Sequence, residues 1–264
     1  MNSPILWAAA GTGFTFLMTA FGASLVFFFR KNINPTTQRV FLGFAAGVMT
    51  AASVWSLLIP AIEEAQASGG TGLVPAAGGF VLGVVFLLLM DHVMPHLHLG
   101  ENQPEGPHCA WQRTTLLVLA VTLHNIPEGM AVGLSFAMAA QHGGDSGSMA
   151  AAMALALGMG IQNFPEEAAV TLPLRQEGVS SMKAFLMGSL SGIVELIFGV
   201  LVVLVAGSVQ PLMPWMLSFA AGAMLYVVVE ELIPEAHLGE HSHSGTISTL
   251  CGFLVMMILD VALG

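Results

Sequence analysis

Two short polar motifs lie inside apolar stretches of the sequence. They read His124-Asn125-Ile126-Pro127-Glu128 and Gln162-Asn163-Phe164-Pro165-Glu166, and both contain a polar residue, an Asn, any residue, a Pro and a Glu. Carboxylates among Leu, Ala, Val, Met and Gly are costly to bury unless a partner compensates their charge. Because the motif occurs twice and consists of metal-ligating residue types, it indicates a cation as that partner.

In a helix, the polar side chains of each motif share one face. His124 and Glu128 are four residues apart, as are Gln162 and Glu166, and such pairs are neighbours on a helix surface. The proline of each motif lacks an N–H, so it kinks the helix and frees a backbone carbonyl in the turn before it. Two such helices side by side present one imidazole, two carboxylates and three amides.

A third acid, Glu195, lies in the apolar stretch 191–198. Neither this stretch nor the two motifs contain a Lys or Arg, so one or two divalent cations would allow Glu128, Glu166 and Glu195 all to ionise. The alternative is that protonated glutamates and amides hold helices together by hydrogen bonds. Met49 is a candidate soft ligand, although most of the 17 Met residues must serve packing.

The composition is that of a polytopic membrane protein, and we expect a single transmembrane domain, residues 1–264. The chain is 55% hydrophobic and 8% charged with a mean hydropathy of +0.81, whereas soluble domains carry about 25% charged residues. No Lys/Arg patch exists, which excludes nucleic acid as a partner. Cys109 and Cys251 form no metal-binding pair, and both are expected to be small buried side chains.

We expect an all-α fold with eight transmembrane helices, because eight apolar stretches reach the length of about 20 residues that spans a bilayer. The N-terminus has no basic segment followed by a cleavage site, so the first stretch is expected to be a retained span. The expected spans are 4–29, 40–64, 73–95, 113–141, 148–174, 181–206, 211–236 and 246–263.

The basic residues predict the orientation in the cell inner or plasma membrane. With eight spans, all six lie in or beside connections on one side: Arg30, Lys31, Arg39, Arg113, Arg175 and Lys183. Cytoplasmic loops are enriched in Lys and Arg, so this side is predicted to be cytoplasmic and both termini extracytoplasmic.

Spans two and seven contain similar segments. Residues 44–49 read FAAGVM and residues 219–224 read FAAGAM, and each segment is followed by Leu-Ile-Pro, at 58–60 and 232–234. The two spans run in opposite directions, so we interpret the match as an inverted repeat that relates spans 1–3 to spans 6–8 around spans 4–5. The alternative is chance recurrence in Ala/Gly-rich helices.

Further polar residues are expected near the two membrane surfaces. On the outer side, Glu63, Glu64, His142 and Asp145 could attract cations or be ordinary surface groups. Asp260 is expected to make a polar contact near a helix end. The residues on the inner side could receive a departing metal or be solvated, and they are Asp91, His92, His96, His98, Glu101, Glu105, His108, Glu231, Glu235, His237, Glu240, His241 and His243.

The two motifs together resemble the signature of the ZIP family of divalent metal transporters, in its prokaryotic, GufA-like branch. The similarity runs over nearly the whole chain, and His-Asn-x-Pro-Glu-Gly at 124–129 with Gln-Asn-x-Pro-Glu at 162–166 is a specific pair. The resemblance implies a two-metal centre midway across the membrane, in spans 4, 5 and 6. It also implies a homodimer and movement of spans one, four, five and six against the other four.

The resemblance assigns ligands residue by residue. His124, Glu128, Gln162 and Glu166 would hold the main ion, and Met49 would contribute to it. Asn125, Asn163 and Glu195 would complete the second ion, which Glu128 and Glu166 would bridge. Two positions depart from the family pattern. Position 163 is Asn where some members carry Asp, so the resemblance does not decide whether a second ion binds. Position 167 is Glu where many members carry Gly, and the resemblance assigns Glu167 no role.

The predicted function is uptake of Zn²⁺ into the cytoplasm, with Fe²⁺, Cd²⁺ and Mn²⁺ as further candidate ions. An intramembrane zinc-dependent hydrolase is the first alternative, but the sequence contains no HExxH motif, and the Glu of each polar motif is used as a ligand. A metal-sensing membrane protein is the second alternative. We therefore expect a transporter and not an enzyme.

Overall fold

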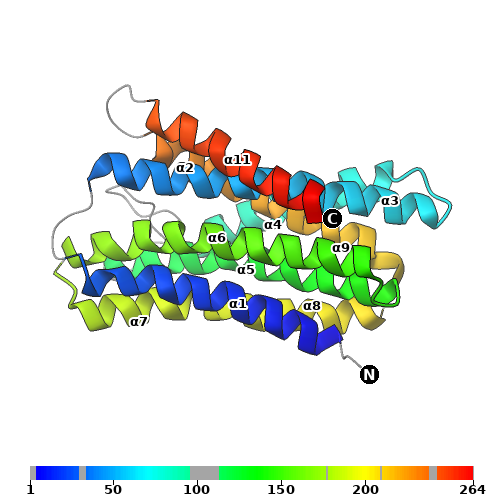
Figure 1. Ribbon diagram of the computed structural model, residues 1–264, viewed down its shortest axis with the longest axis horizontal. Helices are drawn as coiled ribbons and strands as arrows, with labels where there is room; N and C mark the ends of the chain where they lie inside the picture. Colours follow the sequence, from blue (N-terminus) through cyan, green and yellow to red (C-terminus); the bar gives the residue numbers. More distant parts are fainter. Residues whose placement is uncertain are drawn as a thin grey trace.

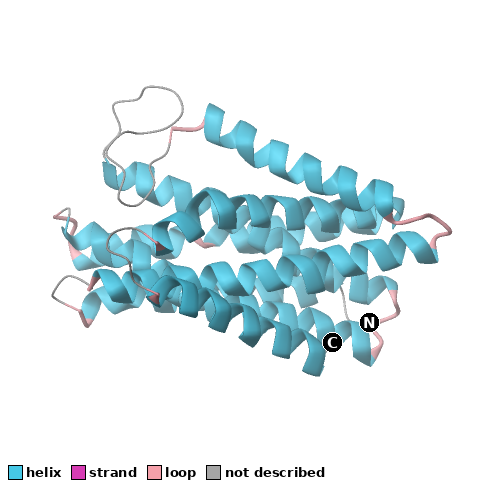
Figure 2. Ribbon diagram, turned by 90° about the horizontal axis from the view of Figure 1, so that it is seen from above, coloured by secondary structure: helices cyan, strands magenta, loops and turns pink. Residues whose placement is uncertain are grey.

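The computed structural model describes residues 4–29, 34–95, 113–176, 178–208, 210–237 and 243–263, and within these ranges it contains helices and turns but no strand (Figure 1). The long helices lie along one common axis, and the view turned by 90° shows the same alignment (Figure 2). The all-α prediction is confirmed for this part of the chain.

The helices have the following bounds in chain order. They are α1 (Pro4–Ser24), the 3₁₀ helix η1 (Leu25–Phe27), α2 (Pro35–Ala52), the π-helix η2 (Ser53–Leu58), α3 (Ile59–Ala67), α4 (Leu73–Val93), α5 (Arg113–Gln141), α6 (Ser146–Gln176), α7 (Ser181–Ser191), α8 (Ile193–Ser208), the 3₁₀ helix η3 (Gln210–Leu212), α9 (Met213–Val227), the π-helix η4 (Val228–Leu232), α10 (Ile233–Ala236) and α11 (Ser244–Leu263).

Seven helical stretches in the described part of the chain are long and apolar enough to cross a membrane. The remaining long helix, α6, has 31 residues but carries Gln162, Asn163, Glu166 and Glu167 near its centre, and these polar residues lower its hydropathy. The expected sixth span is interrupted, since α7 ends at Ser191 and α8 begins at Ile193. This break lies just before Glu195.

Both segments of the proposed repeat contain a π-helix at the same place. The π-helix η2 joins α2 to α3 just before Pro60, and η4 joins α9 to α10 just before Pro234. Proline cannot donate a backbone hydrogen bond, which favours a local change in the hydrogen-bond ladder, and π-helical turns are frequent at functional sites. Glu231 belongs to the second of these turns.

The helices pack in two groups that meet along the centre of the bundle. In one group α1 packs on α6 and α5 on α8; in the other α2 packs on α11 and α4 on α9. Contacts of α2 with α6 and of α5 with α9 join the groups. A buried apolar core runs between them and includes Met49, Leu134, Leu155 and Met224.

One glycine allows α8 to lie close to the first motif on α5. A Cβ on Gly129 would overlap the backbone oxygen of Glu195. Any side chain at this position would therefore push α8 away from α5. The Gly that follows Glu128 in the motif is thus explained by packing, because it allows Glu195 to approach the motif.

Three basic residues lie at one end of the bundle. Helix α1 begins and α11 ends at the same end of the bundle, whereas α2 begins, α6 ends and α7 begins at the opposite end (Figure 1). Arg39, Arg175 and Lys183 belong to those three opposite helix ends. Arg30 and Lys31 lie outside the described residues.

Cys251 corrects a sequence-based expectation, because its side chain is exposed on α11 and not buried. Helix α11 packs on the bundle mainly through a face that contains Gly245, Ser248, Gly252 and Met256. The other faces of α11 remain on the outside of the protein, and Cys251 lies there. Cys109 falls outside the described residues.

Candidate metal centre

The two polar motifs lie in α5 and α6 and are buried. As whole residues, His124, Glu128, Gln162 and Glu166 are all at most 4% exposed. Helices α5 and α6 pack against each other, so the predicted arrangement of two motifs on neighbouring helices is present. Both motif prolines lie inside continuous helices.

The amide side chains of the second motif connect two carboxylates. Gln162 Nε2 donates to Glu128 Oε1 at 2.9 Å and to Asn163 Oδ1 at 2.5 Å. Asn163 Nδ2 in turn lies 3.0 and 2.9 Å from Glu195 Oε1 and Oε2. A continuous chain of hydrogen bonds therefore runs from Glu128 on α5 through α6 to Glu195 on α8.

Several polar atoms of the centre are buried without a hydrogen-bond partner in the structure: Asn125 Nδ2, Glu128 Oε2, Gln162 Oε1 and Glu166 Oε2. Burying such an atom unpaired costs on the order of 1–3 kcal/mol. These atoms belong to the two predicted motifs and three of them are oxygens, so the unpaired set has the chemistry of a cation site.

Among the described residues, no three His, Cys, Asp or Glu side chains converge into a ready-made metal site. The carboxylates are held apart by amides. Gln162 bonds to Glu128 and Asn163 bonds to Glu195, so these amides lie between the two carboxylates. A cation bound here would therefore use amide oxygens among its ligands. The side chain of Met49 is fully buried in the apolar core.

Glu231 is a functional candidate that the sequence reasoning misplaced. We expected it among polar groups at the inner surface, but its side chain is buried and its Oε1 contacts His124 Nε2. Both residues line a cavity of about 20 Å³, together with Glu166 and Glu235, which is enough space for about one water molecule. The sequence did contain a signal for its burial, because Glu231 lies between the apolar run 227–229 and the Leu-Ile-Pro at 232–234.

Thr19 was also missed. Its hydroxyl donates to Glu195 Oε1 at 3.0 Å and accepts from Asn163 Nδ2 at 3.1 Å. Thr12, Thr15 and Thr19 are buried along one face of α1. Their spacing of three and four residues in an apolar helix is a pattern that could have identified this face from the sequence.

Glu167 is buried, and its carboxylate is hydrogen-bonded to residues of α6 and α7. Thr171 Oγ1 donates to its Oε1 at 2.8 Å, and Ser191 Oγ donates to its Oε2 at 3.2 Å. A Cβ on Gly188 would overlap Glu167 Oε1. The carboxylate therefore lies over α7 and links α6 to the end of that helix.

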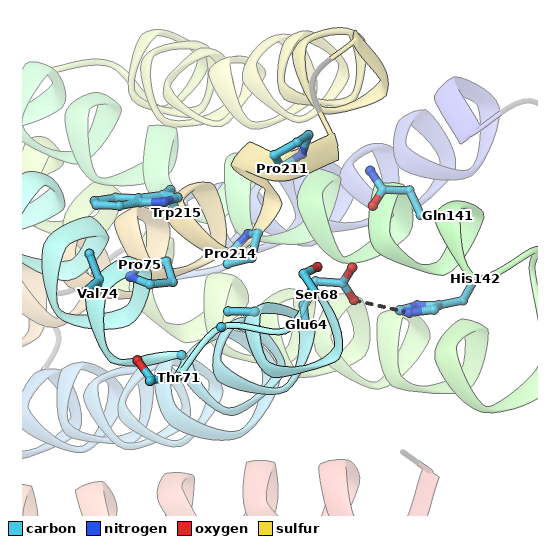
Figure 3. Close-up of a pocket in the computed structure, with 13 residues that line it drawn as sticks. Glu64, Ser68, Thr71, Val74, Pro75, Gln141, His142, Pro211, Pro214 and Trp215 are labelled. Carbon is cyan, nitrogen blue, oxygen red and sulfur yellow. Dashed lines mark ion pairs between the residues drawn. The ribbon is translucent and has the colours of Figure 1, made fainter.

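A pocket of about 740 Å³ opens at the end of the bundle where α3 and α5 end, and Figure 3 shows its lining. Glu64 Oε2 and His142 Nε2 are 3.3 Å apart across this region.

Asp145 caps the start of α6, and hydrogen bonds from Ser148 lower the pKa of Asp145 below its ordinary value. Glu64, His142 and Asp145 are three of the four residues that the sequence analysis expected near the outer surface.

Of the other polar residues that the sequence analysis named, some lie in the described part of the chain and others lie outside it. His237 contacts Ile233 O and Thr246 Oγ1 through its two ring nitrogens, and Tyr226 donates to Asp91 Oδ2 at 2.5 Å. Asp260 makes the expected polar contact, because Ser56 Oγ donates to its Oδ1 at 2.6 Å. The expected inner-side residues that lie outside the described ranges are His96, His98, Glu101, Glu105, His108, Glu240 and His241.

Long apolar helices around a buried centre of imidazole, carboxylate and amide groups define a multi-pass membrane protein of the metal-transporter type. A family model described as ZIP Zinc transporter matches residues 108–260. The chain belongs to this family, which confirms the resemblance seen in the two motifs.

Three relatives show how far the similarity extends. The chain is 38% identical to Zinc transporter ZIP11 of Homo sapiens, over 100% of this chain and 99% of that protein. It is 38% identical to Zinc transporter GufA of Myxococcus xanthus, over 89% and 90% of the two chains. It is also 38% identical to Zinc transporter ZIPB of Bordetella bronchiseptica, over 98% and 81%.

Proposed function

We propose that this protein carries divalent transition-metal ions across a membrane and that its main activity is Zn²⁺ uptake into the cytoplasm. The observation that carries this proposal is the group of unpaired buried oxygens on α5 and α6, at Glu128, Gln162 and Glu166. A divalent cation pairs all three at once, and the named relatives are zinc transporters. Fe²⁺, Cd²⁺ and Mn²⁺ are further candidate ions, since oxygen ligands select weakly among them.

The main ion is held by His124, Glu128, Gln162 and Glu166. One neutral imidazole and two carboxylates give the site a net negative charge, which compensates a divalent ion, and a ligand set without thiolates suits an ion that must also leave. Met49 is proposed as a soft ligand from the facing helix group. It is buried in α2, which packs on α6.

Glu231 provides the next carboxylate along the path. It contacts His124 and shares the small cavity with Glu166. We assign it the role of receiving the ion when His124 releases it. Asn125, Asn163 and Glu195 border the main site on its other side, where the family resemblance implies a second ion.

The topology that we propose has eight spans, with α6 as the fifth. Its 31 residues reach about 46 Å at the helical rise of 1.5 Å per residue, and it packs within the bundle. An inverted repeat is supported by the two π-helices before Ile-Pro and by reciprocal packing, because α2 pairs with α11 as α9 pairs with α4. Extracytoplasmic termini are supported by basic residues at the opposite end of the bundle.

Transport is proposed to involve movement of α1, α5, α6, α7 and α8 against the other helices. Each group has its strongest packing within itself. The other proposed ligands lie on the first group, while Glu231 and the proposed ligand Met49 lie on the second. Such movement would change the distance between the ion and Glu231. A homodimer is part of the proposal, and the whole chain acts as one transporter domain.

The test is metal flux into liposomes that contain the purified protein, with Zn²⁺, Fe²⁺, Cd²⁺, Mn²⁺ or Mg²⁺ outside and with or without a proton gradient. We expect Zn²⁺ flux in the wild type and none in Glu128→Ala. A matched control is Glu63→Ala, because Glu63 is an exposed acid of α3. Zn²⁺ binding without flux would favour a sensor, and metal-dependent cleavage of a peptide or lipid would favour a hydrolase.

A further inference from the structure

Building on the proposed function, we infer that the side-chain amide of Asn163 occupies the place of a second cation, so that the buried centre carries one divalent ion at a time. The inference concerns three residues from three helices: Thr19 of α1, Asn163 of α6 and Glu195 of α8. All three side chains are at most 3% exposed.

The amide nitrogen of Asn163 is surrounded by oxygens. It lies 3.0 and 2.9 Å from the two carboxylate oxygens of Glu195 and 3.1 Å from Thr19 Oγ1. The Thr19 hydroxyl also lies 3.0 Å from Glu195 Oε1. A cation bound to Glu195 and Thr19 would need the position that this nitrogen holds.

The orientation of the amide follows from its other neighbour. Asn163 Oδ1 accepts a hydrogen bond from Gln162 Nε2 at 2.5 Å. A reversed amide would turn its oxygen toward the oxygens of Glu195 and Thr19 and its N–H groups toward the N–H groups of Gln162. The network therefore favours an amide that donates to Glu195.

The two halves of the centre also differ in their unpaired atoms. Glu128 Oε2, Gln162 Oε1 and Glu166 Oε2 are buried without a partner. Both oxygens of Glu195 accept hydrogen bonds from Asn163. An ion on the first half supplies partners that are missing, whereas an ion on the second half must first displace partners that are present.

The charge of the side chain at position 163 makes the inference testable. The substitution Asn163→Asp would replace the donating amide with a second acceptor oxygen and would add a negative charge beside Glu195. The four carboxylate oxygens of the variant side chain and Glu195 would then repel one another unless a cation bound between them.

The experiment counts Zn²⁺ bound per chain by equilibrium dialysis of the purified full-length protein, followed by elemental analysis. Surface histidines also bind Zn²⁺, so the measured quantity is the difference between each variant and the wild type. We expect Asn163→Asp to gain one ion and Glu195→Gln to leave the count unchanged. Adding Glu195→Gln to Asn163→Asp should remove the ion that was gained. An Asn163→Asp count equal to that of the wild type would overturn the inference.

Two further variants separate this inference from the proposed function. Glu128→Ala should lose one ion, and a wild-type count in that variant would overturn the proposed function and this inference together. Loss of one ion in Glu195→Gln would overturn the inference alone, because it would show a second ion in the wild type. Glu167→Gln is the matched control, since this buried glutamate bonds to Thr171 and Ser191, and its count should equal that of the wild type.

If Asn163→Asp does not fold, as judged by gel filtration, Glu195→Gln still decides the question. An unchanged count in that variant supports the inference, and a loss of one ion refutes it.

Discussion

The two halves of the buried centre contain similar residue types but pair them differently. On the side of Glu128 and Glu166, one oxygen of each carboxylate has no hydrogen-bond partner. On the side of Glu195, Asn163 and Thr19 supply donors. A buried carboxylate alone therefore does not identify a metal ligand, because an amide or hydroxyl can satisfy it instead.

The difference has a physical consequence for binding. A side chain that already has its hydrogen bonds gains little from a cation, since the existing bonds must be broken first. A side chain with unpaired buried oxygens gains the full interaction. We therefore expect variants on the first side to affect transport most and variants on the second side to affect it least.

The largest effect is expected for Glu128→Ala. The change removes an anionic ligand and leaves Gln162 Nε2 without its acceptor on α5, so Zn²⁺ flux into liposomes should fall by at least about 100-fold, the loss that about 3 kcal/mol of ion binding represents. His124→Ala should behave in the same way. Unchanged flux in a variant that elutes as the folded protein would contradict the assignment of the main ion.

A lower pH should weaken Zn²⁺ binding by an intermediate amount. A proton and a metal ion compete for the imidazole nitrogen of His124, and metal ligands must be deprotonated to bind. Affinity should therefore fall as the pH is lowered from about 7.5 to about 5, by about tenfold per pH unit where one proton competes. Calorimetric titration at each pH measures it, and His124→Ala should show a flatter profile. Constant affinity across this range would argue against His124 as a ligand.

Much of the fold followed from the sequence because the signals are local. Apolar stretches of spanning length predicted helix positions within a few residues, and α5 has the same bounds, 113–141, as predicted. The interruption of the sixth span at Gly192 was not predicted, since Gly is common throughout these helices. The exposure of Cys251 was also missed, because a sequence does not reveal which face of α11 packs on α2.

The centre was predictable to the extent that its residues form repeated motifs. Glu128 and Glu166 stand out by spacing alone. Glu231 was expected at the inner surface and Thr19 was missed, because the places of both side chains depend on contacts between helices that are far apart in the sequence, with α5 in one case and with α6 and α8 in the other. Helix periodicity identifies a shared face but not the partner across it.

A smaller effect is expected for Glu195→Ala. The change removes the acceptor of the Asn163 amide but none of the proposed main-ion ligands, so flux should fall by less than about tenfold, as for the loss of one or two buried hydrogen bonds. The liposome assay that is used for Glu128→Ala measures it under identical conditions. A complete loss, equal to that of Glu128→Ala, would show that the two halves of the centre are equivalent for transport.

The smallest effect is expected for Thr19→Val, which keeps the shape of the side chain but removes its hydroxyl. Glu195 and Asn163 retain each other as partners, so the zinc count and the flux should stay close to those of the wild type. The loss of the two hydrogen bonds of the hydroxyl, to Glu195 and from Asn163, should cost about 2 kcal/mol of stability, which corresponds to a melting temperature lower by about 4–8 °C. Thermal unfolding in detergent measures this shift, and Thr12→Val, which leaves the triad of Thr19, Asn163 and Glu195 intact, is the control. If Thr19→Val instead removed a bound ion, the hydroxyl would be a ligand, and the contrast between the paired and unpaired halves would no longer hold.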